Sequence, residues 1–204
     1  MSLADSPAIS RPLTAEDLLS MPDDGVERDL IDGELREWPT TTQSMDLCES
    51  EMTRRNPMHS EAEISIGYEL RRWLESRPAP RGKVVGGEAG FRLTRDPVTF
   101  VGIDVAYVSA EMVANHRRKL KYFDGPPVLA VEILSPSDQH EKIVEKVEKY
   151  LQVGTVVWLA DPDFRTIAVH RPGEAPISFN EHQELDGDPY LPGFRVSVIK
   201  LFEG

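Results

Sequence analysis

Hydrophobic residues recur with a helical period in two segments of the chain. Between Met58 and Leu74 the apolar positions are three or four residues apart, which predicts a helix, and Pro78 ends it. The apolar residues that carry this period, and that we expect to face the core, are Ile64, Tyr68, Leu70, Trp73 and Leu74. A second, amphipathic helix is predicted over residues 140–153, with Gly154 as its stop signal.

Strands are predicted where β-branched and aromatic residues dominate. The predicted strands, in chain order, are residues 83–93, 99–109, 128–134, 155–162 and 166–172. The first two are separated only by the turn-forming segment 94–97, so we expect them to be adjacent. Residues 155–162 are nearly continuously apolar, which is typical of a strand that is buried on both faces.

The N-terminal part of the chain carries signals for a short helix and a hairpin. Thr14, followed three residues later by Asp17, is typical of a helix start. Asp32-Gly33 between two short stretches with apolar residues predicts a β-hairpin turn. Residues 40–57 have no clear period, and we expect a surface loop there.

The order of these elements predicts an α/β (α+β) fold. We expect a flexible lead over residues 1–12 and a single domain over residues 13–204. Its core would be a mixed central β-sheet flanked by helices, with the N-terminal helix and hairpin as an extension. A chain of 204 residues that is 40% apolar can bury such a core.

Composition narrows the classes of function. The formal net charge of −12 repels phosphate backbones at long range, so nucleic-acid binding would need a local basic surface or a metal ion. Cys48 is the single cysteine, which excludes an intrachain disulfide and a thiolate metal cluster. Because we find no signal peptide and no apolar run of about 20 residues, we expect a cytoplasmic protein without a membrane span.

Two carboxylates interrupt the predicted apolar strands. Asp104 lies in the sequence GIDVAYV, and Glu132 lies in LAVEILS. An unpaired charge in a dry interior costs several kcal/mol, so each residue should lie at a strand end, meet a cation or hold a metal. If the two strands are neighbours, Asp104 and Glu132 could share one Mg²⁺ or Mn²⁺. The alternative is that each carboxylate caps a loop or pairs with an arginine.

The helix over residues 140–153 offers a lysine that could join them. Its apolar stripe is centred on Ile143, Val144, Val147, Tyr150 and Leu151. Lys146 borders this stripe, so its methylenes can lie along the core while the ammonium reaches toward the sheet. We expect the other charged residues nearby, Lys142, Glu145 and Lys149, to point to solvent. The alternative for Lys146 is an ordinary lysine at the core boundary.

Five motifs in a fixed order resemble the Uma2 family, a family of unknown function within the restriction-endonuclease-like, PD-(D/E)XK superfamily. The motifs are DLIDGELREWPTT, IDVAYVSAE, GPPVLAVEILSPSD, EKVEKYLQVGTVVWLADP and TIAVHRPG. The resemblance covers most of residues 13–201 and implies a restriction-endonuclease-like core. The order of the five motifs is more specific than any one of them.

The resemblance also implies roles for individual residues. Asp104 matches the aspartate of the family's PDV strand, and Glu132 matches the glutamate of its VEVLSP strand. The superfamily usually has a lysine two residues after this glutamate, where this chain has Leu134. The family instead has a lysine in the following helix, in a K-x-x-x-Y-x-x-x-G pattern. That pattern is matched here by Lys146, Tyr150 and Gly154.

Two further positions match frequent family residues. Glu88, in GGEAGF, could be an additional metal ligand or could hold a water; a surface role at a strand edge is the alternative. His59, at the start of the first long helix, matches a position that is often histidine in the family. A capping or packing role is the alternative for His59.

These observations lead to a hypothesis of a Mg²⁺- or Mn²⁺-dependent endonuclease that hydrolyses phosphodiester bonds in DNA. Asp104 and Glu132, with Glu88, would hold the metal, and Lys146 would assist the attacking water or the transition state. The residues that could contact phosphates are Arg117, Arg118, Lys119 and Lys121; a solvated loop is their alternative. By analogy with restriction-type nucleases, we expect a homodimer.

Two other functions stay open. The chain could be a catalytically inactive nuclease-fold domain that binds a protein or a nucleic acid, which its negative charge favours. It could also be a nuclease that acts on RNA.

Overall fold

The computed structural model describes residues 11–22, 24, 26–38, 57–117, 119–135 and 140–203. The helices are α1 (Ala15–Leu19), α2 (Pro57–Glu75), α3 (Ala110–Asn115), α4 (His140–Gln152) and the short 3₁₀ helix η1 (Val198–Leu201). The strands are β1 (Glu27–Ile31), β2 (Glu34–Trp38), β3 (Lys83–Arg95), β4 (Val98–Val108), β5 (Phe123–Asp124), β6 (Leu129–Ile133), β7 (Val156–Asp161), β8 (Thr166–His170), β9 (Ile177–Asn180), β10 (Glu184–Asp186) and β11 (Arg195–Ser197).

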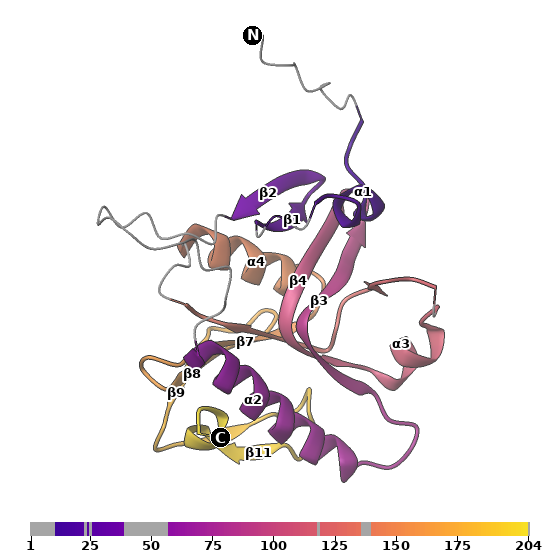
Figure 1. Cartoon of the computed structure of the whole chain (residues 1–204). Coiled ribbons are helices and arrows are strands. Elements are labelled where there is room, and N and C mark those ends of the chain that lie inside the picture. Colours follow the sequence, from indigo (N-terminus) through magenta and orange to yellow (C-terminus); the bar gives the residue numbers. More distant parts are fainter. Residues whose placement is uncertain are drawn as a thin grey trace, which may run out of the picture.

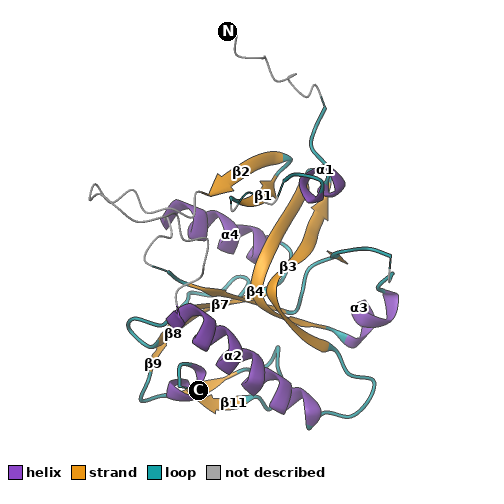
Figure 2. Ribbon diagram, viewed as in Figure 1, coloured by secondary structure: helices purple, strands orange, loops and turns teal. Residues whose placement is uncertain are grey.

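A mixed sheet forms the centre of the molecule (Figure 1). Its main path runs β2-β1-β4-β6-β7-β8-β9, and β3 pairs with β4 and with β5. Strands β6 and β7 are parallel, because α4 connects them, whereas β4 and β6 are antiparallel. Helices α2 and α4 lie on opposite sides of this sheet (Figure 2), which confirms the predicted flanked mixed sheet.

Strand β4 has a feature that determines where a site can form. Strand β3 pairs along β4 from Val98 to Val108, so it occupies one edge of β4. On the other edge, β1 pairs with Phe100, and β6 begins to pair only at Val105. Residues 101–104 of β4 therefore lie between two partner strands on this edge, and we call this interval the β4 gap.

The N-terminal extension forms as its local signals predict. Thr14 and Asp17 make a reciprocal capping box at the start of α1. Asp32 and Gly33 both have positive φ, +53° and +81°, which suits the tight two-residue turn between β1 and β2. Residues 1–10 of the expected lead, and all but Pro57 of the expected loop 40–57, lie outside the described residues.

The expected core face of α2 is correct for Leu70, Trp73 and Leu74, which are buried, but not for Ile64 and Tyr68. The side of α2 that packs on the sheet includes Ala62, Ile66 and Leu70, whereas Ile64 and Tyr68 are 73% and 62% exposed. The predicted period was correct, but Ile64 and Tyr68 start from a position about half a turn away from Ala62 and Ile66. Small residues such as Ala62 carry little hydrophobic signal, so the sequence pattern did not reveal that Ile64 and Tyr68 lie outside the core.

The prediction that three charged residues of α4 point to solvent was also wrong. The β1–β2 hairpin packs beside α4, and ion pairs join the two elements. The nitrogen–oxygen distances are 2.7 Å for Lys142–Glu27, 3.0 Å for Glu145–Arg36 and 2.6 Å for Lys149–Asp32. Lys142 is buried, and its ammonium lies 5.4 Å from the centre of the Trp38 ring. These three residues do not point to solvent because the distant β1–β2 hairpin packs beside them, and the hydrophobic period of α4 alone does not reveal this contact.

In the part of the chain that the structure describes, no helix combines the length and apolar character needed to cross a membrane.

A pair of substitutions tests the orientation of α2. Ile66→Ala should lower the free energy of unfolding by about 2–4 kcal/mol, because it leaves a cavity in the core. Ile64→Ala should change it by less than about 0.5 kcal/mol, because that side chain is largely in water. Urea denaturation measures both. Equal losses for the two variants would contradict this orientation.

Candidate nuclease-type site

Asp104 and Glu132 come together at the end of the β4–β6 pair. Val105 pairs with Val131, so Asp104 and Glu132 are the next facing positions on the two antiparallel strands. The Asp104 carboxylate accepts a hydrogen bond from the backbone N–H of Ile133, with a distance of 2.8 Å between N and Oδ2. The Asp104 side chain therefore accepts from an N–H of β6 in place of a backbone carbonyl of the paired strand. Both carboxylates are buried, with exposed fractions of 5% and 6%.

Helix α4 supplies two donors to Glu132. The Lys146 ammonium lies 2.8 Å from Oε2, and the Tyr150 hydroxyl donates to Oε1 at 2.5 Å. Lys146 and Tyr150 are four residues apart, so they lie on the same side of the helix. Lys146 also donates to the backbone carbonyl of Gly102 in the β4 gap, at 3.0 Å. The sequence motif around Lys146 thus corresponds to one connected group of side chains.

Burial gives these groups unusual acidities. Loss of water raises the pKa of Glu132 to about 8; the Lys146 ammonium opposes this rise, and the Asp104 carboxylate adds to it. Burial also disfavours the Lys146 ammonium, but the attraction of Glu132 and other acidic groups outweighs it and raises the pKa of Lys146 well above its usual value. Burial raises the pKa of Tyr150 too, so it acts as a neutral donor. The cluster therefore holds excess negative charge, which a proton or a cation can balance.

Helix α2 approaches the same place from the other side of the sheet. His59, in its first turn, has Nε2 at 3.4 Å from Oδ2 of Asp104 and is 7% exposed. One turn later, the Glu63 carboxylate accepts a hydrogen bond from the backbone N–H of Gly87, at 2.6 Å. The sequence singled out His59 but not Glu63, because a glutamate in an exposed helical pattern has no distinguishing signal.

Glu88 reaches the cluster through a bulge in β3. The pairing of β3 with β4 shifts between Gly86 and Ala89, and both Gly87 and Glu88 have positive φ, +74° and +60°. The bulge turns the Glu88 side chain over Gly102 of β4. A Cβ atom at Gly102 would collide with the Glu88 carboxylate, so a larger residue here would displace that side chain.

Asp29 is a site residue that the sequence did not reveal. It lies on β1, is 1% exposed, and accepts a hydrogen bond from the backbone N–H of Gly102 at 3.2 Å. Its second oxygen accepts from the indole N–H of Trp38 at 3.2 Å. Asp29 stands in the polar run ERD, so no contrast with apolar neighbours marks it as buried. The sequence predicted the hairpin that carries Asp29, but it did not predict that this hairpin packs against α4.

The donor set suits a hard divalent cation with an incomplete protein shell. Among the described residues, no group of three or more His, Cys, Asp or Glu side chains is close enough to enclose a metal ion. Mg²⁺ is usually held by one or two carboxylates, with waters and substrate phosphates completing its shell. Asp104 and Glu132 fit this pattern, because both are buried, and burial together with the Asp104 charge raises the pKa of Glu132, so a cation beside them would be favoured. The negative charge of Glu88 contributes to the rise in the pKa of Lys146.

The predicted phosphate-binding loop lies elsewhere. Arg117, Lys119 and Lys121 are exposed between α3 and β5, and Arg118 lies outside the described residues. Figure 1 places α3 and this connection on the other side of the β3–β4 hairpin from α4. The described structure therefore does not bring these cations into the acidic cluster, and their contact with nucleic acid stays a prediction.

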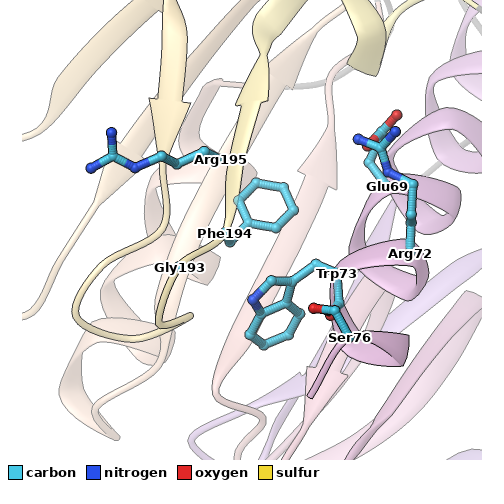
Figure 3. Close-up of a pocket in the computed structure, with 7 residues that line it drawn as sticks. All are labelled: Glu69, Arg72, Trp73, Ser76, Gly193, Phe194 and Arg195. Atoms are coloured by element: carbon cyan, nitrogen blue, oxygen red, sulfur yellow. The ribbon is translucent and has the colours of Figure 1, made fainter.

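A pocket of about 260 Å³ also lies away from the cluster (Figure 3). It is formed by the C-terminal half of α2 and the segment that enters β11. Its lining residues are Glu69, Arg72, Trp73, Ser76, Gly193, Phe194 and Arg195. Its charged residues are already paired: Glu69 with Arg72, and Arg195 with Asp186. This pocket adds no group to the Asp104–Glu132 cluster.

Comparison with known proteins identifies the class of fold. A crystal structure described as a putative nuclease belonging to DUF820, from Anabaena variabilis, superimposes with a TM-score of 0.72. The match covers 94% of this chain and 98% of that chain at 18% sequence identity. The fold is restriction-endonuclease-like, as the sequence motifs implied.

The chain belongs to the Uma2 family, whose model is described as "Putative restriction endonuclease" and matches residues 15–199. This match confirms the family resemblance in the sequence. No curated protein matches the chain.

The acidity of Glu132 predicts a pH dependence of stability in the absence of divalent metal. Its pKa of about 8 in the folded protein exceeds the usual 4.5, so the folded state binds more protons than the unfolded state between these values. The stability of the wild type should therefore fall as pH rises from about 5 to 8. The Glu132→Gln variant lacks this contribution. The difference in free energy of unfolding between the two proteins should change by roughly 2 kcal/mol or more over this range.

Urea denaturation in EDTA at several pH values measures this difference, and titrating groups outside the Glu132 cluster cancel between the two proteins. Parallel pH profiles for the wild type and Glu132→Gln would contradict the raised pKa.

Proposed function

We propose that this protein is a divalent-metal-dependent endonuclease that hydrolyses phosphodiester bonds in DNA. The observation that carries the proposal is the meeting of Asp104 and Glu132 on adjacent strands, with the Lys146 ammonium 2.8 Å from Glu132. A buried group of two carboxylates and a lysine is costly to maintain, so a functional reason for it is stronger than a structural one. Membership in a family described as "Putative restriction endonuclease" supports the same activity.

Asp104 and Glu132 are the residues that would hold Mg²⁺ or Mn²⁺. Such an ion polarises the scissile phosphate and makes a bound water more acidic. Asp104 is held toward this position by the N–H of Ile133, and Glu132 by Lys146 and Tyr150. Glu88 is the third acidic group of the proposed site, where it would bind a metal-associated water.

Lys146 would act as a cation rather than as a base. It donates hydrogen bonds to Glu132 and to the Gly102 carbonyl, and although burial disfavours the ammonium, the attraction of Glu132 outweighs it and raises the pKa of Lys146, which keeps the amine protonated. From this position the ammonium can orient the attacking water and stabilise negative charge on the phosphate in the transition state. Tyr150 holds the second oxygen of Glu132 and keeps that carboxylate oriented. His59 would orient Asp104 from the opposite side.

DNA is the proposed substrate despite the net charge of −12. The metal ion would lower the local negative potential of the site, and the exposed residues Arg117, Lys119 and Lys121 would contact the phosphate backbone at a distance from it. We propose a homodimer, because a two-fold assembly lets one kind of site cut both strands. Cytoplasmic DNA would be the target.

A second function is supported by one observation. Both oxygens of Glu132 already accept hydrogen bonds from protein donors, which is compatible with a site retained for structure alone. The protein would then be a catalytically inactive binding module for a protein or a nucleic acid.

A cleavage assay separates the two functions. The wild type should cleave plasmid or single-stranded DNA only with Mg²⁺ or Mn²⁺, and Asp104→Asn should lower the rate at least about 100-fold, because the ion loses a charged ligand. Asp163→Asn, which changes an exposed aspartate in the β7–β8 turn, is the matched control and should retain the wild-type rate. RNA in the same assay ranks the two polymers. An absence of metal-dependent cleavage of either polymer would favour the binding module.

Lys146 provides a separate test of mechanism. Lys146→Met keeps most of the side-chain volume but removes the cation, so kcat should fall about 100-fold or more while KM for DNA changes little. Tyr150→Phe removes only a hydrogen bond to Glu132 and should cost about tenfold in kcat. Steady-state kinetics with Mg²⁺ measures both. A loss confined to KM would assign Lys146 to substrate binding instead.

A further inference from the structure

The backbone N–H and the backbone carbonyl of Gly102 each form a hydrogen bond with a side chain from another element. Its N–H donates to Asp29 of β1 at 3.2 Å, and its carbonyl accepts from Lys146 of α4 at 3.0 Å. Gly102 lies in the β4 gap, where no strand pairs with this edge of β4. One residue of β4 therefore connects the N-terminal hairpin to the lysine of the proposed site.

Asp29 is an expensive way to satisfy one backbone N–H. The residue is 1% exposed, and both of its hydrogen-bond donors, the Gly102 amide and the Trp38 indole, are neutral. A buried carboxylate held only by neutral donors costs free energy unless a cation lies nearby. Lys146 and Lys142 supply the opposing charge, because they counteract the rise in the pKa of Asp29 that burial causes. A neutral acceptor would satisfy the same N–H at lower cost.

The surroundings of Gly102 favour a link between the two charged groups. No side chain separates Asp29 from Lys146 at this residue, and the Glu88 carboxylate closes the space above its Cα atom. The hairpin itself is also fixed to α4 by three ion pairs, from Lys142, Glu145 and Lys149. Movement of the hairpin would therefore move Asp29, Gly102 and the acceptor of Lys146 together.

We propose that Asp29 is a positioning residue, which acts through Gly102 to hold the Lys146 ammonium against Glu132 and so makes the β1–β2 hairpin part of the active site. This inference rests on the proposed nuclease function. The hydrogen bonds of Asp29 come from Gly102 and Trp38 rather than from Asp104 or Glu132, so its contribution to catalysis would act through Lys146. Its removal should therefore matter only while Lys146 is present.

A double-mutant cycle on activity tests this dependence. Asp29→Asn keeps the size of the side chain and one acceptor oxygen, and it should lower kcat about tenfold with KM for DNA unchanged. In the Lys146→Met background the same substitution should lower kcat less than about twofold. Equal losses in the two backgrounds, or a change in KM alone, would overturn the proposal.

Asp32→Asn is the matched control. Asp32 lies on the same hairpin and pairs with α4 through Lys149, but it is about half exposed and does not contact Gly102. Asparagine also tolerates the positive φ of this turn position. This variant should keep kcat within about twofold of the wild type. A loss as large as that of Asp29→Asn would assign the effect to general loosening of the hairpin and would overturn the specific role of Asp29.

The stability of the four proteins of the double-mutant cycle gives a readout that does not require activity. If the wild type cleaves neither DNA nor RNA, the proposed function fails, and urea denaturation then tests the link alone. Lys146→Met removes the larger of the two lysine charges that oppose Asp29, so the loss of stability caused by Asp29→Asn should shrink by at least about half in that background. Identical losses in the two backgrounds would overturn the link through Gly102.

Discussion

The structure of this site depends on the β4 gap, where the pairing of one strand edge is interrupted. Strand β1 leaves β4 after Phe100, and β6 joins it only at Val105. Backbone groups in such an interval must find other partners, because buried N–H and C=O groups are almost always hydrogen-bonded. Here the partners are ionisable side chains: Asp29 and Lys146 bind the Gly102 backbone, and Asp104 binds the N–H of Ile133 at the end of β6.

This arrangement concentrates charge in the interior of the protein. Three buried carboxyl groups, from Asp29, Asp104 and Glu132, lie near the ammonium of Lys146 or next to one another, and the exposed Glu88 carboxylate adds to their charge. Lys146 and Lys142 offset part of this negative charge, but burial and the Asp104 carboxylate still raise the pKa of Glu132. A divalent cation is the simplest group that restores the balance and that also makes a phosphodiester reactive. The electrostatic problem created by the fold and the proposed chemistry thus have the same solution.

Much of this fold was predictable, because its signals are local or depend on contrast. Asp104 and Glu132 stand out as charges in apolar strands, and the α1 capping box and the Asp32-Gly33 turn are local sequence signals. Asp29 and Lys142 were missed because they are charges in polar segments, and they are buried only by the packing of the hairpin on α4. This packing joins segments more than 100 residues apart, so no local period records it.

The central claim is that Asp104 and Glu132 hold one divalent ion beside Lys146. Crystals soaked with Mn²⁺ test this claim most directly, because anomalous scattering locates the metal without reference to activity. The account predicts an anomalous peak bonded to one oxygen of Asp104 and one of Glu132, at about 2.1 Å from each. Density at another position, or none at a Mn²⁺ concentration that supports cleavage, would contradict it.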